Sequence, residues 1–213
     1  MKGVKFGNYH SYDDFQLILS SKTIGTPSPK TESIDIPGGD GVLDLTEFFG
    51  EVKYSNRTLS FDFSVIVPQA EFMDVFAKVQ NALHGQKMQI VLDDDPQWMY
   101  TGRINVSEWK AQRSIGEITI DCDCEPYKER LGDTVIFQMV EGTEETVVLP
   151  NGRKPVVPII DITGNIDLTF GANFWALTEG RYELPAVRLV NGDNTVLLSG
   201  TGTATFTYRE RGL

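Results

Sequence analysis

Residues 57–85 read RTLSFDFSVIVPQAEFMDVFAKVQNALHG, and this stretch decides the fold of the first half of the chain. Up to Val67 apolar and polar residues alternate, as in a strand with one buried face and one wet face. After Pro68 the spacing changes to three and four residues, which places five apolar residues on one side of a helix: Phe72, Val75, Phe76, Val79 and Leu83. The stretch therefore predicts a strand at 57–67 and one long helix at about 69–84.

The two-residue period returns after the helix, over residues 87–92, 98–109 and 115–124, with a turn expected at 93–97. Residues 125–133, EPYKERLGD, then interrupt the pattern with Pro126, Gly132 and a run of charges. We therefore predict a mainly β chain of two domains. Residues 1–131 would form an α+β domain, an antiparallel sheet with one long helix, and residues 132–213 would form a small β-sandwich.

The second half carries a turn signal every few residues and no helical pattern, which predicts a succession of short strands. The expected turns are Asn151-Gly152, Gly164-Asn165, Gly171-Ala172-Asn173, Asn191-Gly192-Asp193 and Gly200-Thr201-Gly202.

Composition restricts the classes of function. The 213 residues include 30 Asp and Glu against 19 Lys and Arg, for a formal net charge of −11. Such a balance argues against a surface that binds the nucleic acid backbone. No export signal and no membrane span are expected from the sequence. Cys122 and Cys124 lack neighbouring ligands for a metal, so we expect two buried thiols kept reduced in a cytoplasm.

The segment 34–47, IDIPGGDGVLDLTE, admits three interpretations: a phosphate-binding loop, a calcium loop or a tight turn. A phosphate loop requires a Gly-Lys-Ser/Thr ending, and this segment has no lysine. A calcium loop starting at Asp40 would need an oxygen ligand where Val42 stands. We therefore predict a structural turn made by Gly38, Gly39, Asp40 and Gly41, with glycines supplying positive φ.

For several other groups of polar residues, a functional hypothesis competes with a simpler structural interpretation. His10, Ser11, Asp13 and Asp14 are too close in sequence to converge as a catalytic triad, so a polar turn is expected. His84 is expected at the negative end of the helix. The run 93–95, DDD, is expected to be a charged turn because no second cluster of metal ligands is visible. The sequence thus predicts no enzyme, no cofactor and no metal site.

Phe174 and Trp175 are the candidate saccharide contacts, since adjacent aromatic rings can form a stacking platform for sugars. The competing interpretation is core or interface packing, which is common for aromatic residues in sandwich strands. A carbohydrate-binding module acting through the second domain is therefore the main alternative function.

Three motifs occur in order over about the first 130 residues: HSYDDF (10–15), IPGGDGVLDLT (36–46) and YSNRTLSF (54–61). In these motifs the chain resembles the distal tail proteins of siphophages and prophages of Gram-positive bacteria. The resemblance implies that the first domain forms a hexameric ring and that the second is a galectin-like sandwich.

The resemblance also implies a location and partners. The ring would lie at the tail tip of the virion, as part of the baseplate, after assembly in the host cytoplasm. It would join the tail tube protein and the tape measure protein to the tail-tip or receptor-binding machinery. DNA would cross the central channel without specific binding, and an acidic lumen would repel its phosphates.

Overall fold

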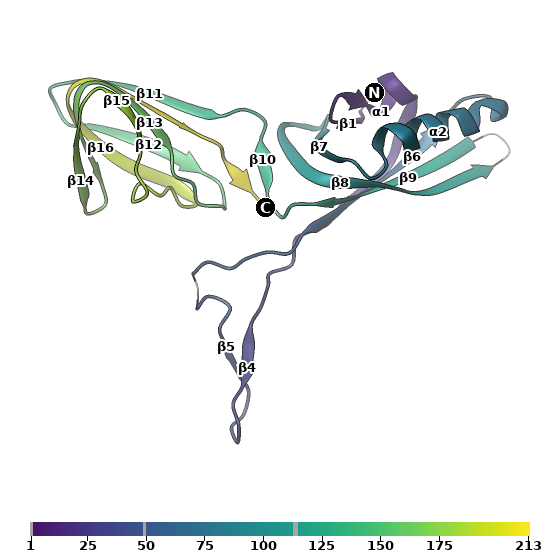
Figure 1. Cartoon of the computed structure of the whole chain (residues 1–213), viewed down its shortest axis with the longest axis horizontal. Helices are drawn as coiled ribbons and strands as arrows, with labels where there is room; N and C mark the ends of the chain where they lie inside the picture. The colour runs from purple at the N-terminus through teal and green to yellow at the C-terminus, as the bar shows by residue number, and fades with distance from the viewer. Residues whose placement is uncertain (1, 49, 113–114) are drawn as a thin grey trace. The chain divides into compact units, whose positions relative to one another are not determined.

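The structure, a computed structural model, describes residues 2–48, 50–112 and 115–213. Contacts divide the chain into two compact units, Met1–Pro126 and Tyr127–Leu213 (Figure 1). The chain is mainly β, with antiparallel sheets. No helix among the described residues has the length and apolar character that a bilayer crossing requires.

The first unit is built on an antiparallel sheet with the strand order β2-β1-β7-β8-β9-β6-β3. These strands are β1 (Val4–Phe6), β2 (Tyr9–His10), β3 (Leu17–Ile24), β6 (Arg57–Val65), β7 (Lys87–Leu92), β8 (Asp95–Gln112) and β9 (Ile115–Cys124). Its helices are α1 (Ser11–Phe15) and α2 (Phe72–Leu83). A separate ribbon of β4 (Ser33–Asp35) and β5 (Val42–Asp44) lies between β3 and β6 in sequence.

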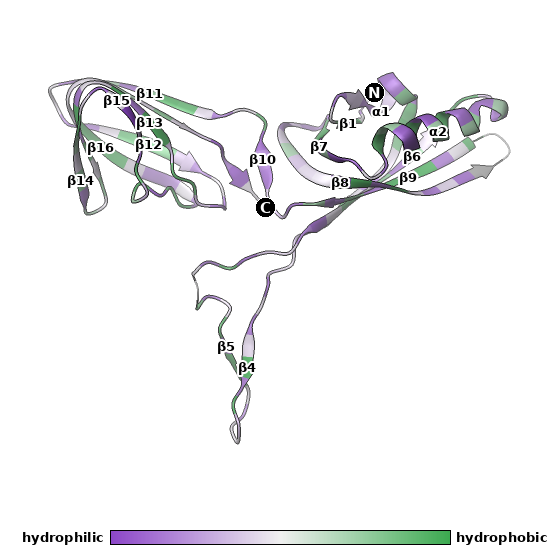
Figure 2. Cartoon of the chain, viewed as in Figure 1, coloured by the Kyte–Doolittle hydropathy of each residue, from purple (hydrophilic) through white to green (hydrophobic). Residues whose placement is uncertain are grey.

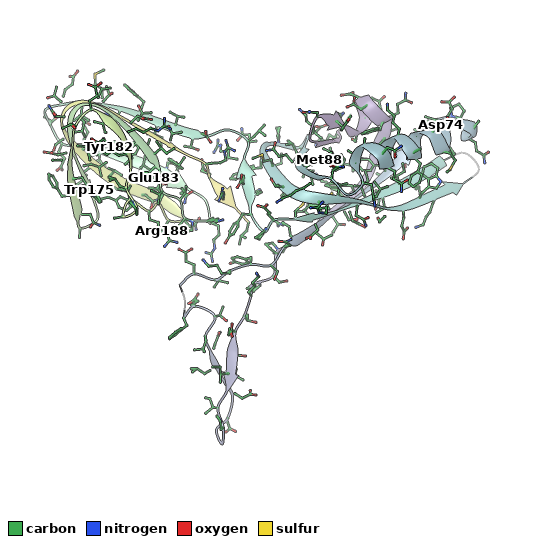
Figure 3. The ribbon with its side chains drawn as sticks, in the orientation of Figure 1. Asp74, Met88, Trp175, Tyr182, Glu183 and Arg188 are labelled. Carbon is green, nitrogen blue, oxygen red and sulfur yellow. The ribbon has the colours of Figure 1, made fainter. Side chains whose placement is uncertain are left out.

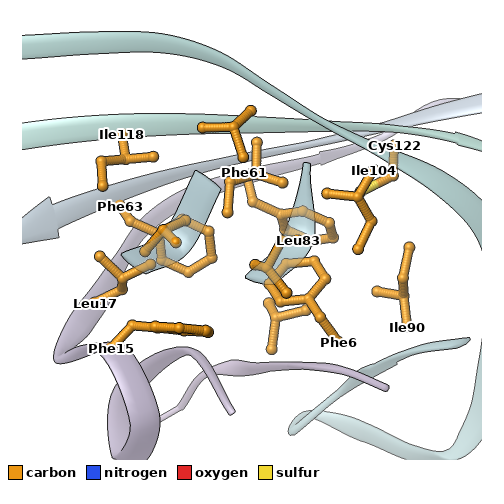
Figure 4. Close-up of a cluster of buried hydrophobic side chains, with 14 of the residues drawn as sticks. Phe6, Phe15, Leu17, Phe61, Phe63, Leu83, Ile90, Ile104, Ile118 and Cys122 are labelled. Carbon is orange, nitrogen blue, oxygen red and sulfur yellow. The ribbon is translucent and has the colours of Figure 1, made fainter. Parts of the chain in front are cut away.

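The strand and the long helix predicted from residues 57–85 are both present. In β6 the alternate residues from Arg57 to Val65 are buried. Helix α2 buries Phe72, Val79 and Leu83 in the same apolar cluster as the sheet. Figure 4 shows Leu83 of this helix among buried residues of the strands. The first three residues of the predicted helix, Gln69–Glu71, instead form a 3-10 turn.

Two predicted turns of the first unit are wrong in detail. Residues 11–15 form a short helix because the His10 Nδ1 atom accepts a hydrogen bond from the Asp13 amide (3.3 Å), which caps its first turn. The turn expected at 93–97 spans only two residues, because Leu92 already pairs with Asp95 at the start of β8.

The second unit contains an antiparallel sheet of six strands: β11 (Thr134–Glu141), β12 (Glu145–Asn151), β13 (Ile159–Phe170), β14 (Asn173–Leu177), β15 (Gly180–Glu183) and β16 (Gly192–Tyr208). The short strands β10 (Lys128–Arg130) and β17 (Arg211–Gly212) pair with each other. The late half of β16 pairs with β11 and its early half with β12, while β13 pairs with β16 from Leu197 to Thr207. Two long strands therefore run through the whole sheet.

Strands β13 and β16 curve over (Figure 1). Three glycines lie in the interior of these strands: Gly164, Gly200 and Gly202. Gly164 pairs directly with Gly202, and Gly200 pairs with Ile166. A Cβ on Gly202 would lie 1.9 Å from the Thr163 carbonyl oxygen, and one on Gly164 would lie 2.3 Å from that of Thr201. The turns predicted at these glycines are wrong: the residues form a crease inside continuous strands, because only glycine permits so close an approach of two backbones.

Candidate assembly interface

The segment between β3 and β6, residues 26–56, forms an extended arm that leaves the sheet of the first unit (Figure 1). Its base is closed by backbone hydrogen bonds from Lys30 to Lys53 (2.8 Å) and from Ser55 to Ser28 (2.9 Å). Beyond this base, every residue from 28 to 44 is exposed. The described residues of the arm thus contribute to neither hydrophobic core.

The tip of the arm is the turn predicted from the glycines. The Gly39 amide donates to the Ile36 carbonyl oxygen (3.1 Å), with Pro37 and Gly38 between them. Gly38 has a φ of 76°. Proline followed by a residue with positive φ is the signature of a type II turn. Gly41, with a φ of 81°, leads the chain into β5, and Asp40 lies exposed between them.

The ribbon of the arm has one apolar and one acidic face. Ile34 pairs directly with Leu43, so both side chains lie on the same face, and both are more than half exposed. Asp35 and Asp44 lie on the opposite face by alternation. Further exposed apolar side chains of the arm are Ile36, Val42 and Phe48. The hydropathy colouring in Figure 2 shows hydrophobic and hydrophilic stretches along the ribbon of β4 and β5. An isolated two-stranded ribbon of this length is marginal in water, so its apolar face needs a surface to cover it.

The acidic face is held in place locally. The Asp44 carboxylate accepts a hydrogen bond from the Thr46 amide (2.9 Å), and hydrogen bonding to Thr46 lowers the pKa of Asp44. The Thr46 hydroxyl accepts a hydrogen bond from the Glu32 amide (3.1 Å) across the ribbon. These contacts keep Asp44 ionised and the two strands in register.

Arg57 forms the junction at the root of the arm. It is only 7% exposed, and its Nε donates to the Gly25 carbonyl oxygen (2.8 Å), where the chain leaves β3. Its Nη1 lies 3.4 Å from the Pro126 carbonyl oxygen, where the first unit ends. The guanidinium also lies 5.4 Å from the centroid of the Tyr100 ring, a cation–π distance. Arg57 therefore holds two places in the first unit: the start of the arm, at Gly25, and the end of the unit, at Pro126.

Replacing Arg57 by glutamine should lower the free energy of unfolding of the first unit by about 2–3 kcal/mol, since it leaves two part-buried carbonyl groups without the charged donor. Arg103→Gln is the matched control, because Arg103 also donates to a carbonyl, that of Gly85 (2.7 Å), but at an exposed site. Urea unfolding followed by tryptophan fluorescence measures both. Equal losses for the two variants would contradict the role given to Arg57.

The sheet face opposite α2 is open and acidic. Register places side chains of β6, β9 and β8 on this face, among them the carboxylates Asp62, Glu108, Glu117, Asp121 and Asp123 and the cations Arg103 and Lys110. Part of it forms a depression of about 390 Å³. Hydrogen bonds from Ser21 (2.6 Å) and Thr119 (2.8 Å) lower the pKa of Asp62. The open face therefore carries an excess of negative charge at neutral pH.

The histidine and serine considered for catalysis have separate partners. The Ser11 hydroxyl accepts a hydrogen bond from the Val4 amide (3.1 Å), while His10 Nε2 lies 3.2 Å from the Asp93 carboxylate. His84 is the C-cap of α2, and its Nδ1 accepts from the Val106 amide (3.2 Å). These side chains have structural roles in capping and in joining strands.

The aspartates at 93–95 are not gathered as ligands. Asp93 accepts the Gly3 amide (2.6 Å), and Asp94 pairs with Lys22, whose hydrogen bond lowers the pKa of Asp94. The described part of the chain holds no group of three or more His, Cys, Asp or Glu side chains that could bind a metal ion.

The two cysteines are free and buried in the core of the first unit. Burial raises the pKa of both thiols, that of Cys124 to about 12. They are thus protonated at neutral pH and poor nucleophiles.

Phe174 and Trp175 do not form one platform. They are consecutive in β14, so their side chains lie on opposite faces of the strand. Phe174 is 63% exposed, whereas Trp175 packs against the core of the second unit (Figure 3). A bound sugar would therefore contact one of these two rings and not both.

Comparison with known proteins finds a solved structure of similar fold. No protein-family model matches the sequence, and no curated protein matches it. Among solved structures, the chain is similar to the SPP1 Dit (gp 19.1) protein, with a TM-score of 0.69 over 98% of this chain and 99% of that one. The fold is that of SPP1 Dit. That protein is described as a paradigm of the hub of the adsorption apparatus in phages that infect Gram-positive bacteria. At 13% identity the likeness is one of fold alone.

Proposed function

We propose that this chain is a structural hub protein of a phage tail that closes into a hexameric ring through its arm. The observation that carries the proposal is the apolar face of the arm, where Ile34 and Leu43 remain more than half exposed among the residues that the structure describes. In a ring, the arm of each copy lies against the first unit of the next, and the same contact repeats until the ring closes. The Dit-like fold and the three sequence motifs support the same role.

In this account the open acidic face of the first unit lines the channel. Carboxylates along a channel repel the phosphates of DNA, so the DNA passes without adhering. The ring lies at the tip of the virion tail, between the tail tube and tape measure proteins and the tail-tip or receptor-binding machinery. Residues 1–131 form the ring domain, and residues 132–213 form a galectin-like sandwich.

Reversing charge on the open face tests the channel role. With Glu117→Lys and Asp123→Lys, the purified assembly should bind linear double-stranded DNA at low salt and release it as salt rises, while the native protein should not bind. Glu144→Lys with Glu179→Lys makes the same change in net charge on exposed residues of the second unit. Mobility-shift assays compare the two. Equal DNA binding by both variants would contradict a channel position for the open face.

Negative-stain electron microscopy of the purified protein tests the ring itself. The proposal predicts rings with a central hole. The alternative function, a carbohydrate-binding module, predicts separate particles and binding of the full chain to cell-wall saccharide that Phe174→Ala abolishes. Separate particles together with such binding would favour the module over the hub.

A further inference from the structure

A second exposed apolar surface among the described residues lies on β11. In β11 the alternate residues Val135, Phe137 and Met139 are 59%, 59% and 53% exposed. They form an apolar stripe on the outer face of the sheet, where the neighbouring strand β16 places Thr203, Thr205 and Thr207. This stripe lies in the second unit and is separate from the arm.

Strand β11 is also an edge of the sheet, since β16 is its one partner in the described sheet. The Gly142 amide donates to the Gly200 carbonyl oxygen (2.7 Å), which continues the regular β11–β16 ladder. Backbone groups alternate in direction along a strand, so the amides and carbonyls of Val135, Phe137 and Met139 point to the open edge. The apolar stripe and the free hydrogen-bonding groups therefore belong to the same residues.

Nothing within the strand protects this edge. Natural edge strands are blunted by charged residues, proline or a bulge. Strand β11, TVIFQMVE, has its single charge at the last residue, Glu141, and pairs with β16 without a shift in register. The other strand on the same side of β16, β12, contains Pro150. The contrast indicates that β11 is kept open for a partner strand.

We propose that the partner is β11 of a second copy, paired antiparallel about a two-fold axis at Phe137. The stripe is self-complementary in this register: Phe137 lies opposite Phe137 of the other copy, and Val135 lies opposite Met139. Each outward residue then exchanges two hydrogen bonds with the residue facing it, about six in all. Six apolar side chains form one continuous patch.

The charges at the ends of the strand agree with this register. It places Glu141 opposite Asp133 of the other copy. The Asp133 carboxylate is already paired with Arg209, whose Nε and Nη2 both lie 2.8 Å from it. Arg209 therefore neutralises the Asp133 carboxylate before Glu141 of the other copy approaches it from the open edge.

A contact of one strand from each copy is small, so its affinity as an isolated pair is low. Its population rises when copies are held close together, because the effective concentration is then high. The contact uses no residue of the arm and does not depend on ring closure.

Disulfide trapping in the full-length chain tests the register. Phe137→Cys places two thiols directly opposite each other, at a Cα separation that a disulfide can span. After mild oxidation, non-reducing electrophoresis in detergent should show a covalent dimer, and peptide mass spectrometry should find the 137–137 link. The native cysteines are buried and should contribute little. Detergent dissociates any non-covalent ring, so the result is independent of the proposed hub function.

Val135→Cys is the matched control, because Val135 has the same exposure on the same face. In this register its thiol lies four residues from its counterpart, roughly 13 Å away, which a disulfide cannot span. Phe137→Cys should therefore form dimer at least about tenfold faster, and Val135→Cys combined with Met139→Cys should regain the linkage. Equal rates for the two single variants, or no dimer from Phe137→Cys, would overturn the proposal.

Discussion

Replacing Ile34 and Leu43 by glutamate should leave the chain folded and abolish its assembly. Both side chains lie on the apolar face of the arm, are just over half exposed and belong to neither of the hydrophobic cores that the described residues form. Burying that exposed half of each against a neighbour contributes about 0.8–1.5 kcal/mol, so the pair contributes about 1.5–3 kcal/mol to each contact. Since about 1.4 kcal/mol is a tenfold change in affinity, losing this contribution should weaken each contact at least about tenfold, and burying the two new carboxylates weakens it further. Light scattering after gel filtration should give the mass of one chain.

The control for this variant is Thr31→Glu combined with Val42→Glu. It adds the same charge to exposed positions of the arm, but Val42 lies on the face that carries Asp35. This control should assemble as the native chain does. Melting temperatures of both variants should match the native value, because neither change touches a core. If both variants lose assembly equally, or neither does, the apolar face of the arm is not the ring contact.

Gly202→Ala should unfold much of the second unit while the first stays intact. The new Cβ would lie 1.9 Å from the Thr163 carbonyl oxygen, which belongs to the backbone of the paired strand and cannot rotate away. The crease would have to open, at a cost of about 3 kcal/mol or more, a large part of the stability of a small domain. Hydrogen exchange should rise across β11–β16 and remain slow in β6 and β9.

Gly132→Ala is the control, since a Cβ at Gly132 would meet nothing within 4 Å. Its effect on stability should stay within about 0.5 kcal/mol. Protection of β13 and β16 that is as high in Gly202→Ala as in the native chain would contradict the account of the crease.

The sequence was sufficient to predict those elements in which the spacing of apolar residues matches the buried face. The alternation of β6 and the helical spacing of α2 each reflect a face packed on a core. Arg57 could also have been found, because it falls in the same alternating series as Leu59 and Phe61. A charged residue at an inward position indicates a special role, here the root of the arm.

Other features depend on partners that local sequence does not specify. A glycine permits a turn or a close approach of two strands, so Gly164, Gly200 and Gly202 give the same signal for a hairpin as for a crease. The two strands of the arm were predictable, but their exposure was not, because no local pattern states whether a second sheet covers them. By contrast, the alternation of side chains along a strand is enough to predict that Phe174 and Trp175 lie on opposite faces.

Native mass spectrometry of the full-length protein at micromolar concentration measures how many chains the assembly contains. We expect a closed assembly of six times the 23.8 kDa mass of one chain, lost when Ile34 and Leu43 are replaced by glutamate. A native chain that remains a monomer at every concentration, or an assembly of six that persists in the arm variant, would contradict this expectation.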